Sequence, residues 1–244
     1  MMDNLTIAMW SGPRNLSTAM MRSFGNRNDT VVLDEPFYAH YLLKTGLNHP
    51  GRESIINSQS AKWNEIIKIC IGRIPKGKSV WYQKHMAQHN LKGYDISWIS
   101  NLQNCLLIRN PKYVIHSYAQ QLPIKNESQL GYKQQIEILE YIKKINGTIP
   151  PIIDAKDVLL HPENILKKLC DKIGIGFSKS MLSWKKGSKV SDGIWGKYWY
   201  SSVNKSTSFI PYKKRDIVLA RDLVPIYNKC MELYMMMYKH RIRP

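Results

Sequence analysis

The segment at residues 11–18 (SGPRNLST) holds residue types that bind anions. Arg14 supplies a fork-shaped cationic donor, and the hydroxyls of Ser17 and Thr18 can donate hydrogen bonds to phosphate oxygens. Gly12 lets the backbone approach an anion closely. The segment stands between a strand-like and a helix-like stretch, where free backbone N–H groups and the helix dipole attract negative charge. We therefore predict a loop that binds phosphate or sulfate.

This loop differs from the loop of ordinary ATP-binding proteins. The pattern G-x-x-x-x-G-K-[ST] would need Gly in place of Ser17 and Lys in place of Thr18. ATP binding is therefore disfavoured. The alternative without any ligand is a strand–turn–helix unit in which Ser17 and Thr18 only cap the helix.

A second polar motif follows another strand-like stretch, in the sequence LLIRNPKYVIHSY. Arg109 ends the apolar run, and Ser117 lies eight residues later on the expected helix. An arginine at a strand end and a serine on the next helix can converge on one phosphate from two sides. The alternative is a surface arginine and an unrelated helical serine.

Both motifs resemble those of the sulfotransferases that use 3′-phosphoadenosine-5′-phosphosulfate (PAPS). The family's phosphosulfate loop P-K-S-G-T-T is similar to Pro13, Arg14, Asn15, Leu16, Ser17 and Thr18. Its R-N-P-x-D-x-x-x-S-Y motif is matched by Arg109, Asn110, Pro111, Ser117 and Tyr118, with Tyr113 in place of Asp. Two softer matches, HPENILKKLCDKIGI at 161–175 and WKKG at 184–187, follow in the family's order, so the resemblance covers roughly the whole chain.

The resemblance implies roles for these residues. Gly12 and residues 13–18 would hold the 5′-phosphosulfate of PAPS, and Arg109 with Ser117 would hold its 3′-phosphate. The chemistry would need no metal. Sulfuryl transfer needs an in-line acceptor, charge stabilisation on the moving group and a base for the acceptor proton.

Glu35, in TVVLDEPFYAHY, is the first candidate for that base. It follows the second expected strand, so it should open onto the same sheet edge as the phosphate loop. The segment resembles the Glu-Pro segment of carbohydrate-type sulfotransferases, in which the glutamate is the base. Burial there would raise its pKa toward a useful range. The alternative is a carboxylate that only stabilises the start of a helix.

His85 is the second candidate base. It ends another expected strand, and Lys84-His85 resembles the K-T-H-L-P segment of aryl and steroid sulfotransferases with the spacing off by one residue. His85 and His89 also form an H-x-x-x-H pair, but Met86 replaces the glutamate of the zinc-protease motif. His89 is a further base candidate or simply a polar helix residue. Lys84 either brings charge to the sulfuryl group or is solvated.

Strand and helix patterns alternate along the chain. Strands are expected at 5–10, 30–35, 79–85, 104–109 and 150–157, and helices at 15–24, 55–71, 129–145, 161–173 and from after Pro211 to about Lys239. This order predicts a single α/β domain, residues 1–244, with a mostly parallel sheet flanked by helices. The resemblance implies the P-loop NTPase-like variant of that fold. The irregular residues 184–209 and residues 45–60 are expected to form the acceptor pocket, with at least one of Trp195 and Trp199 in the crevice.

Lys and Arg total 36 against 18 Asp and Glu, a formal charge of +18. This excess favours an anionic partner, which can be a nucleic acid, a membrane surface or a phosphorylated or sulfated small molecule. A general bias toward Lys, Asn and Ile is an equal alternative cause. A hydrophobic content of 43% excludes wholesale disorder.

The four cysteines lie far apart with no C-x-x-C pair, which disfavours a zinc knuckle and indicates reduced thiols. No apolar run approaches the ~18 residues of a membrane helix. The first apolar stretch, of six residues, follows Asp3 instead of a basic segment, which does not fit a signal peptide. We therefore expect a cytoplasmic protein without membrane contact.

Together these features predict sulfuryl transfer from PAPS to a hydroxyl or amine of a small acceptor. The alternatives are a phosphotransferase on the same loop, a basic nucleic-acid-binding protein, for which no module is recognisable, and a family member without catalysis, because Arg14 replaces the family's lysine. Neither the identity of the acceptor nor the oligomeric state can be inferred from the sequence.

Overall fold

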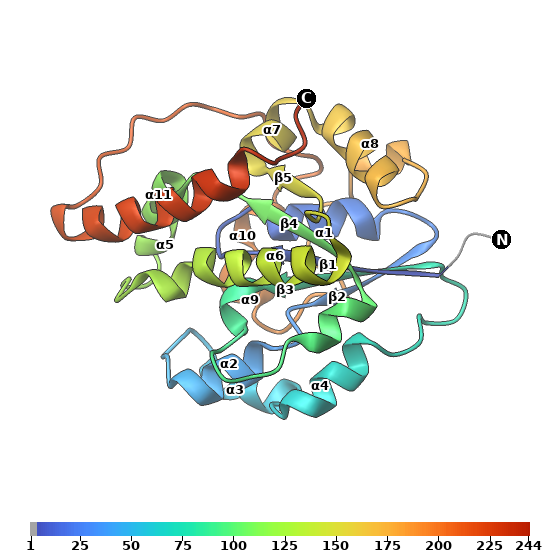
Figure 1. Ribbon diagram of the computed structural model, residues 1–244, viewed down its shortest axis with the longest axis horizontal. Coiled ribbons are helices and arrows are strands. Elements are labelled where there is room, and N and C mark those ends of the chain that lie inside the picture. The colour runs from blue at the N-terminus through green and yellow to red at the C-terminus, as the bar shows by residue number, and fades with distance from the viewer. Residues whose placement is uncertain (1–3) are drawn as a thin grey trace.

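The computed structural model describes residues 4–244. Its central sheet has five strands in the order β2–β3–β1–β4–β5. They are β1 (Leu5–Ser11), β2 (Thr30–Asp34), β3 (Val80–Met86), β4 (Gln103–Ile108) and β5 (Ile152–Asp154). Every neighbouring pair is parallel. The predicted single-domain α/β fold is therefore confirmed, and the sheet is wholly parallel (Figure 1).

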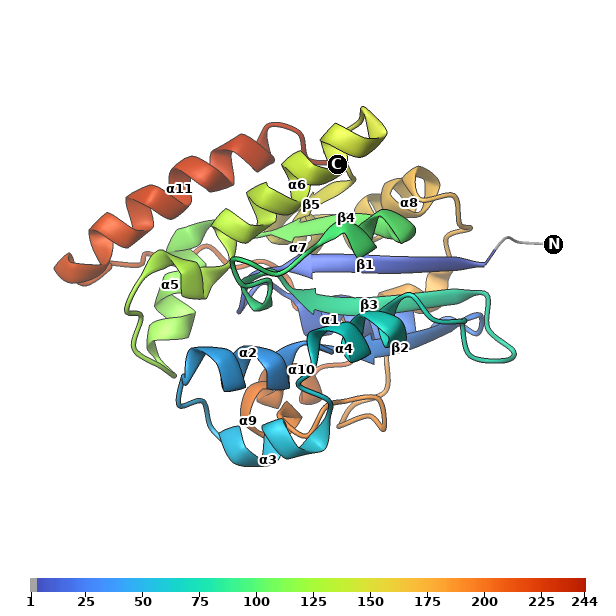
Figure 2. The same cartoon turned by 60° about the horizontal axis from the view of Figure 1, so that its bottom comes forward.

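Alternating side chains of the central strand β1 serve two hydrophobic cores. Ile7 and Met9 belong to the core that α1 (Ser17–Gly25) and α8 (Pro162–Lys172) cover. Ala8 and Trp10 belong to the core that α4 (Trp63–Cys70), α6 (Tyr132–Asn146) and α11 (Val224–Tyr238) cover. Successive strand residues point to opposite faces, so a strand buried on both sides is apolar throughout. The helices therefore cover both faces of the sheet (Figure 2).

The helices fall close to the positions expected from the apolar spacing. The longer ones are α1 (Ser17–Gly25), α2 (Tyr38–Thr45), α3 (Arg52–Ser58), α4 (Trp63–Cys70), α5 (Pro111–Ala119), α6 (Tyr132–Asn146), α7 (Ala155–Leu160), α8 (Pro162–Lys172) and α11 (Val224–Tyr238). The helix expected at 55–71 is two helices, α3 and α4, separated by residues 59–62. α8 begins at Pro162 and ends before Gly174, as the start and stop residues predict.

Two segments after α8 complete the fold. The wall, residues 184–209, is irregular as expected and contains only the short helices α9 (Gly196–Trp199) and α10 (Ser201–Asn204). The strap, residues 210–220, has no regular structure. The helix expected from after Pro211 was therefore wrong over this segment. With like charges at 213–215 and with Ile210 and Val218 exposed, Ile217 is the one apolar side chain of the strap that is buried, which is too little to stabilise a helix.

Within residues 4–244, no helix is both long and apolar enough to cross a membrane. The four cysteines are free thiols, and all four are buried.

Candidate active site

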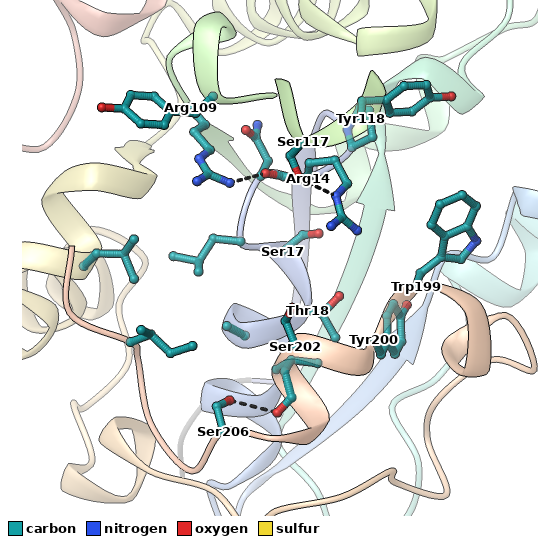
Figure 3. A pocket seen from close by; sticks show the side chains of 18 of the residues that line it. Arg14, Ser17, Thr18, Arg109, Ser117, Tyr118, Trp199, Tyr200, Ser202 and Ser206 are labelled. Carbon is teal, nitrogen blue, oxygen red and sulfur yellow. Dashed lines mark hydrogen bonds between the residues drawn. The ribbon is translucent and has the colours of Figure 1, made fainter. Parts of the chain in front are cut away.

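A cavity of about 440 Å³ opens at the carboxyl ends of the strands. Its floor is formed by residues 13–19 after β1, Glu35 after β2, Lys84 and Met86 on β3 and Arg109 after β4. α5, the wall and the strap close the sides (Figure 3). In parallel α/β sheets, ligands bind at this edge, where connections leave the sheet in opposite directions. The predicted loop and the predicted strand-end arginine therefore share one cavity.

The loop between β1 and α1 has a strained backbone that suits an anion. Arg14 and Leu16 both have positive φ, 59° and 70°. Residues other than glycine adopt this region at a cost, and alternation of left- and right-handed residues turns successive N–H groups toward one point. α1 begins at Ser17 with no side-chain cap. The arrangement therefore does not support the interpretation of Ser17 and Thr18 as mere helix caps.

Two loop residues predicted to bind the ligand make contacts that hold the loop, although Asn15 also lines the cavity. The Nδ2 of Asn15 donates to the carbonyl oxygen of Leu107 at 2.9 Å, and this side chain is buried. Gly12 does not line the cavity. A Cβ at Gly12 would lie 2.3 Å from the carbonyl oxygen of Leu130, so the close approach that requires glycine is to another backbone segment, not to an anion.

The two motif arginines are connected to each other. The Nε of Arg14 donates to the Oγ of Ser117 at 2.9 Å, and Nη1 of Arg109 donates to the carbonyl oxygen of Arg14 at 2.7 Å (Figure 3). Burial lowers the pKa of both guanidinium groups. No carboxylate of residues 4–244 forms an ion pair with either arginine. This half of the site therefore has an uncompensated positive charge.

The strap adds two cations that sequence reasoning missed. Lys213 and Arg215 line the cavity, and the positive charge of Arg215 contributes to the lowered pKa of Arg109. The hydroxyl groups of Tyr212 and Tyr113 are hydrogen-bonded at 2.8 Å, which joins the strap to α5. Lys185 and Lys186 of the WKKG segment are exposed and do not line the cavity. The run of three cations at 213–215 is the only feature of the sequence that could have pointed to these two residues.

Glu35 lies at the opposite side of the cavity in a buried charge network. Its Oε1 accepts from the Nζ of Lys84 at 2.6 Å, and Lys84 also donates to Oδ1 of Asp34 at 3.0 Å. Two carboxylates thus share one ammonium group. Burial raises the pKa of Glu35, Lys84 opposes that rise, and the charge of Asp34 adds to it. Burial alone would lower the pKa of Lys84, but the two carboxylates raise it above its ordinary value.

Tyr200 of the wall completes this network. Its hydroxyl accepts hydrogen bonds from Lys84 at 2.6 Å and from Nε1 of Trp195 at 3.0 Å, and it donates to Asp34 at 2.7 Å. Asp34 also accepts from the backbone N–H of Gly193 at 3.1 Å. Asp34 thus has three donors, whereas Glu35 has a single close one, Lys84.

A second anchor joins the wall to α1. The guanidinium group of Arg22 forms a buried two-point ion pair with Asp192, with its Nη2 at 2.6 Å from Oδ2. Asp192 therefore serves the wall rather than the cavity.

His85, the second candidate base, lies away from the cavity. Its ring stacks on Trp10 with the centroids 4.3 Å apart, and its Nε2 is 3.0 Å from Oε1 of Gln83. Burial lowers its pKa to about 3. Neighbouring strand residues point to opposite faces, so a chain that turns Lys84 toward the cavity turns His85 into the core behind it.

Aromatic and imidazole rings line the cavity around Glu35. They belong to Tyr38, His49, His89, Tyr118 and Trp199. The prediction for the two tryptophans is confirmed, because Trp199 lines the cavity, whereas Trp195 is buried beneath it. Of residues 45–60, only His49 reaches this cavity, so that loop contributes less than expected.

In the part of the chain that the structure describes, no three His, Cys, Asp or Glu side chains gather in a way that could hold a metal ion.

A family model described as a sulfotransferase domain matches residues 5–241. Among solved structures, a sulfotransferase domain from the curacin biosynthetic pathway superimposes with a TM-score of 0.55 at 13% identity, covering 100% of this chain and 99% of that one. A sulfotransferase from Alicyclobacillus acidocaldarius gives 0.51 at 11% identity, covering 96% of each chain. At such low sequence identity, these two superpositions show a shared fold only.

Two curated proteins of Arabidopsis thaliana are closer in sequence. Branched-chain-amino-acid aminotransferase-like proteins 1 and 2 are 34% and 33% identical over 234 residues, which is 96% of this chain. The chain spans only 42% and 41% of their lengths. Their names do not mention sulfuryl transfer. The family match covers nearly all of the described residues and includes both motifs that line the cavity. On the basis of that match, the chain belongs to the sulfotransferase family.

Proposed function

We propose that this chain transfers a sulfuryl group from PAPS to a hydroxyl or amine of a small acceptor. The observation that carries the proposal is the convergence of Arg14 and Arg109 in one cavity without a carboxylate partner among residues 4–244. Partly buried cations need compensation, and a donor with a 3′-phosphate and a 5′-phosphosulfate supplies it.

The donor lies along the loop, the end of β4 and the strap. The backbone N–H groups of the loop, with Ser17 and Thr18, hold the 5′-phosphosulfate, and Arg14 lies beside them. Arg109 and Ser117 hold the 3′-phosphate, and the hydrogen bond from Arg14 to Ser117 connects the two sites. The cations of the strap add charge to the same end. No residue in this assignment needs a metal.

Glu35 is the proposed base. An oxygen or nitrogen of the acceptor attacks the sulfur, and its proton passes to the Glu35 carboxylate. The bond between sulfur and the bridging oxygen of the 5′-phosphate breaks, and that oxygen keeps the electron pair as 3′-phosphoadenosine-5′-phosphate (PAP) leaves. Lys84, 2.6 Å from Glu35, stabilises the carboxylate before transfer and negative charge on the sulfuryl oxygens during it. A raised pKa improves the carboxylate as a base near neutral pH.

Calorimetric binding of PAP, ATP and AMP tests the donor site. The wild-type chain should prefer PAP, and Arg109→Ala should weaken PAP binding by about 10- to 100-fold, the effect of losing a charge-assisted hydrogen bond. Lys214→Ala is the matched control, because Lys214 lies between two cavity residues of the strap but is exposed outside it.

Two results would overturn this proposal. Equal binding of the three nucleotides with magnesium-dependent ATP turnover would favour a phosphotransferase. Steeply salt-dependent binding of oligonucleotides without PAP binding would favour a nucleic-acid-binding protein.

A cytoplasmic location remains part of the proposal and is compatible with four free thiols.

A further inference from the structure

Asp34 and Glu35, at the end of β2, bind the same ammonium group. The Nζ of Lys84 donates to Oδ1 of Asp34 at 3.0 Å and to Oε1 of Glu35 at 2.6 Å. Asp34 is 6% exposed, Glu35 is 8% exposed and Lys84 is 1% exposed. Two carboxyl groups and one ammonium group therefore meet where water barely reaches. We call Asp34, Glu35 and Lys84 the carboxylate–lysine cluster.

The backbone is strained at the point that brings the two carboxyl groups together. Neighbouring residues of a strand point to opposite faces, so Asp34 and Glu35 would not share a partner in a regular strand. Glu35 instead has a φ of 42°, while its N–H still donates to the carbonyl oxygen of Lys84 at 3.0 Å. A residue other than glycine adopts this region only where the surrounding structure holds it there, and such residues cluster at functional sites. The fold therefore maintains the shared contact with Lys84 against a local strain.

The two carboxylates differ in their other partners. Asp34 also accepts from the hydroxyl of Tyr200 at 2.7 Å and from the backbone N–H of Gly193 at 3.1 Å. Among the described residues, the side chain of Glu35 has Lys84 as its one short contact, and its further contact with Tyr200 is 3.4 Å long. Hydrogen bonds donated to a carboxylate favour its charged form. Glu35 lines the cavity and Asp34 does not. Asp34 is therefore held as a charged group behind the cavity, while Glu35 reaches it.

The other titratable groups around Glu35 carry no net charge near pH 7. Four rings line the cavity with it, from α2, the segments after α2 and β3, and the wall: Tyr38, His49, His89 and Tyr200. Burial raises the pKa of both tyrosines and lowers the pKa of both histidines, to about 4 for His49. Arg22 of α1 and Asp192 of the wall form an ion pair with each other. Arg14, from the loop after β1, is hydrogen-bonded to Ser117 on the other side of the cavity. The charge at this side is therefore that of the carboxylate–lysine cluster.

The charges of this cluster balance only when Glu35 carries a proton. With Glu35 ionised, two negative charges stand against one positive charge. With Glu35 protonated, Asp34 and Lys84 remain as a one-to-one pair. A buried net charge is disfavoured relative to a buried pair, so the cluster favours the uptake of one proton. The raised pKa of Glu35 has the same direction, because burial contributes most to the rise and the charge of Asp34 adds to it, while Lys84 opposes it.

We propose that Asp34 is a positioning residue, which keeps Lys84 paired while Glu35 takes up the proton of the acceptor. The inference rests on the proposed function, in which Glu35 is the base. As the oxygen or nitrogen of the acceptor bonds to sulfur, its proton passes to Glu35, and the electron pair of the broken sulfur–oxygen bond leaves with PAP. Lys84 then loses the charge of Glu35 and keeps that of Asp34. Without Asp34, the transfer would leave a buried ammonium group with no counter-charge, which disfavours it.

Asp34→Asn tests this role, because it removes the charge and keeps the size of the side chain. The chain is labelled with carbon-13 at the glutamate carboxyl groups, and the resonance that is missing from Glu35→Gln belongs to Glu35. NMR then measures the titration midpoint of Glu35 in the wild-type chain and in Asp34→Asn. In the variant, Lys84 and Glu35 are balanced when Glu35 is ionised, so the midpoint should fall by at least about one pH unit.

Two control variants separate the effect of charge from other effects. Tyr200→Phe removes a hydrogen bond to Asp34 without changing the charge of the cluster, so the midpoint should move much less than in Asp34→Asn. Glu53→Gln removes a carboxylate from an exposed position and should leave the midpoint of Glu35 unchanged. A merely structural role of Asp34 would lower the stability of Asp34→Asn and of Tyr200→Phe alike and would not single out the titration of Glu35 in the former.

Three results would overturn the inference. They are a midpoint in Asp34→Asn at or above the wild-type value, an equal fall in Tyr200→Phe, and a wild-type midpoint at or below the ordinary glutamate value of about 4.3. The last result is independent of whether any variant folds. Calorimetry with PAP on the wild-type chain tests the proposed function separately. Absence of PAP binding contradicts that function, whereas normal PAP binding with any of the three results overturns the inference and leaves the donor site standing.

Discussion

The two ends of the cavity handle charge in opposite ways. At one end Arg14 and Arg109 share no carboxylate within residues 4–244, and two strap cations stand beside them. At the other end Lys84 is enclosed by two carboxylates and a tyrosine hydroxyl. An unpaired cluster is suited to bind a polyanion, whereas a paired cluster is suited to hold and move a proton.

The two ends also differ in whether the chain itself supplies the groups that compensate their charges. In the proposed function the donor compensates the charge of these cations, so the effect of substituting them should depend on the donor. The network around Lys84 is satisfied by the chain itself, with donors from β3 and the wall. Substitutions at the two ends should therefore give distinct signatures, donor affinity at one end and turnover or stability at the other.

The largest effect is expected for Glu35→Gln. Removing the base should lower kcat by about 10²–10⁴-fold, while PAP binding stays near the wild-type value. Steady-state kinetics and calorimetry on one preparation give both numbers. Wild-type kcat/KM should fall toward acid pH, with a midpoint above the ordinary glutamate range, because protonation of Glu35 removes the base and its pKa is raised. Full activity in the variant would remove Glu35 from the mechanism.

The next effect is loss of stability in mild acid. Burial lowers the pKa of His49 to about 4 and that of His85 to about 3. The unfolded chain, with histidine near 6.5, takes up protons that the folded chain refuses, so stability falls as pH falls below about 6.5. The slope is about 1.4 kcal/mol per pH unit for each histidine, and the contribution of His49 levels off below about pH 4. Denaturant midpoints between pH 7 and 4.5 measure it, and His49→Gln should reduce the slope. A flat profile would contradict the buried neutral state of both rings.

Tyr200→Phe should affect only the end of the cavity that contains Lys84. The hydroxyl joins Lys84, Asp34 and Trp195, and its loss leaves buried donors unsatisfied. We expect a decrease of about 1–3 kcal/mol in the free energy of unfolding, measured with denaturant, and little change in PAP affinity. Tyr198→Phe, at a neighbouring wall tyrosine that is not in the network, is the matched control. An equal loss in both variants would show that the network has no special role.

The smallest effect is expected at the partly exposed strap. Arg215→Ala should weaken PAP binding about three- to tenfold and make it less sensitive to salt, since one cation fewer attracts the donor. Calorimetry at two ionic strengths measures both changes. Lys214→Ala should leave both unchanged. Unchanged PAP binding in Arg215→Ala would mean that this side chain faces solvent rather than the donor.

Local sequence rules predicted most of what positions the site. The apolar runs located all five strands, and residue types at two strand ends located Arg14 and Arg109 in one cavity. These features are encoded within short segments. A strand, a turn and the start of a helix are largely decided by neighbouring residues, and parallel strands bring their ends to one edge.

What could not be predicted depends on tertiary contacts. The face to which a strand residue points is fixed by the register of the sheet, so a one-residue offset moved His85 from the cavity to a stack on Trp10. The strap has no period of its own and is held to α5 through Tyr212 and Tyr113. Lys84 and Asp34, two partners of Tyr200, lie more than a hundred residues away from it in sequence. Such contacts leave no pattern in a local window.

The late positions of the wall and the strap in the sequence also determine when the site is completed during protein synthesis. All five strands end by Asp154, and α5 with Ser117 precedes β5. The chain grows from its N-terminus, so the sheet and both phosphate motifs leave the ribosome before Tyr200 and Arg215. A nascent chain at that stage has a bare Lys84 cluster and an open cavity. The site closes only when the last quarter of the chain has packed against the sheet, so a chain that ends before Tyr200 should have no activity.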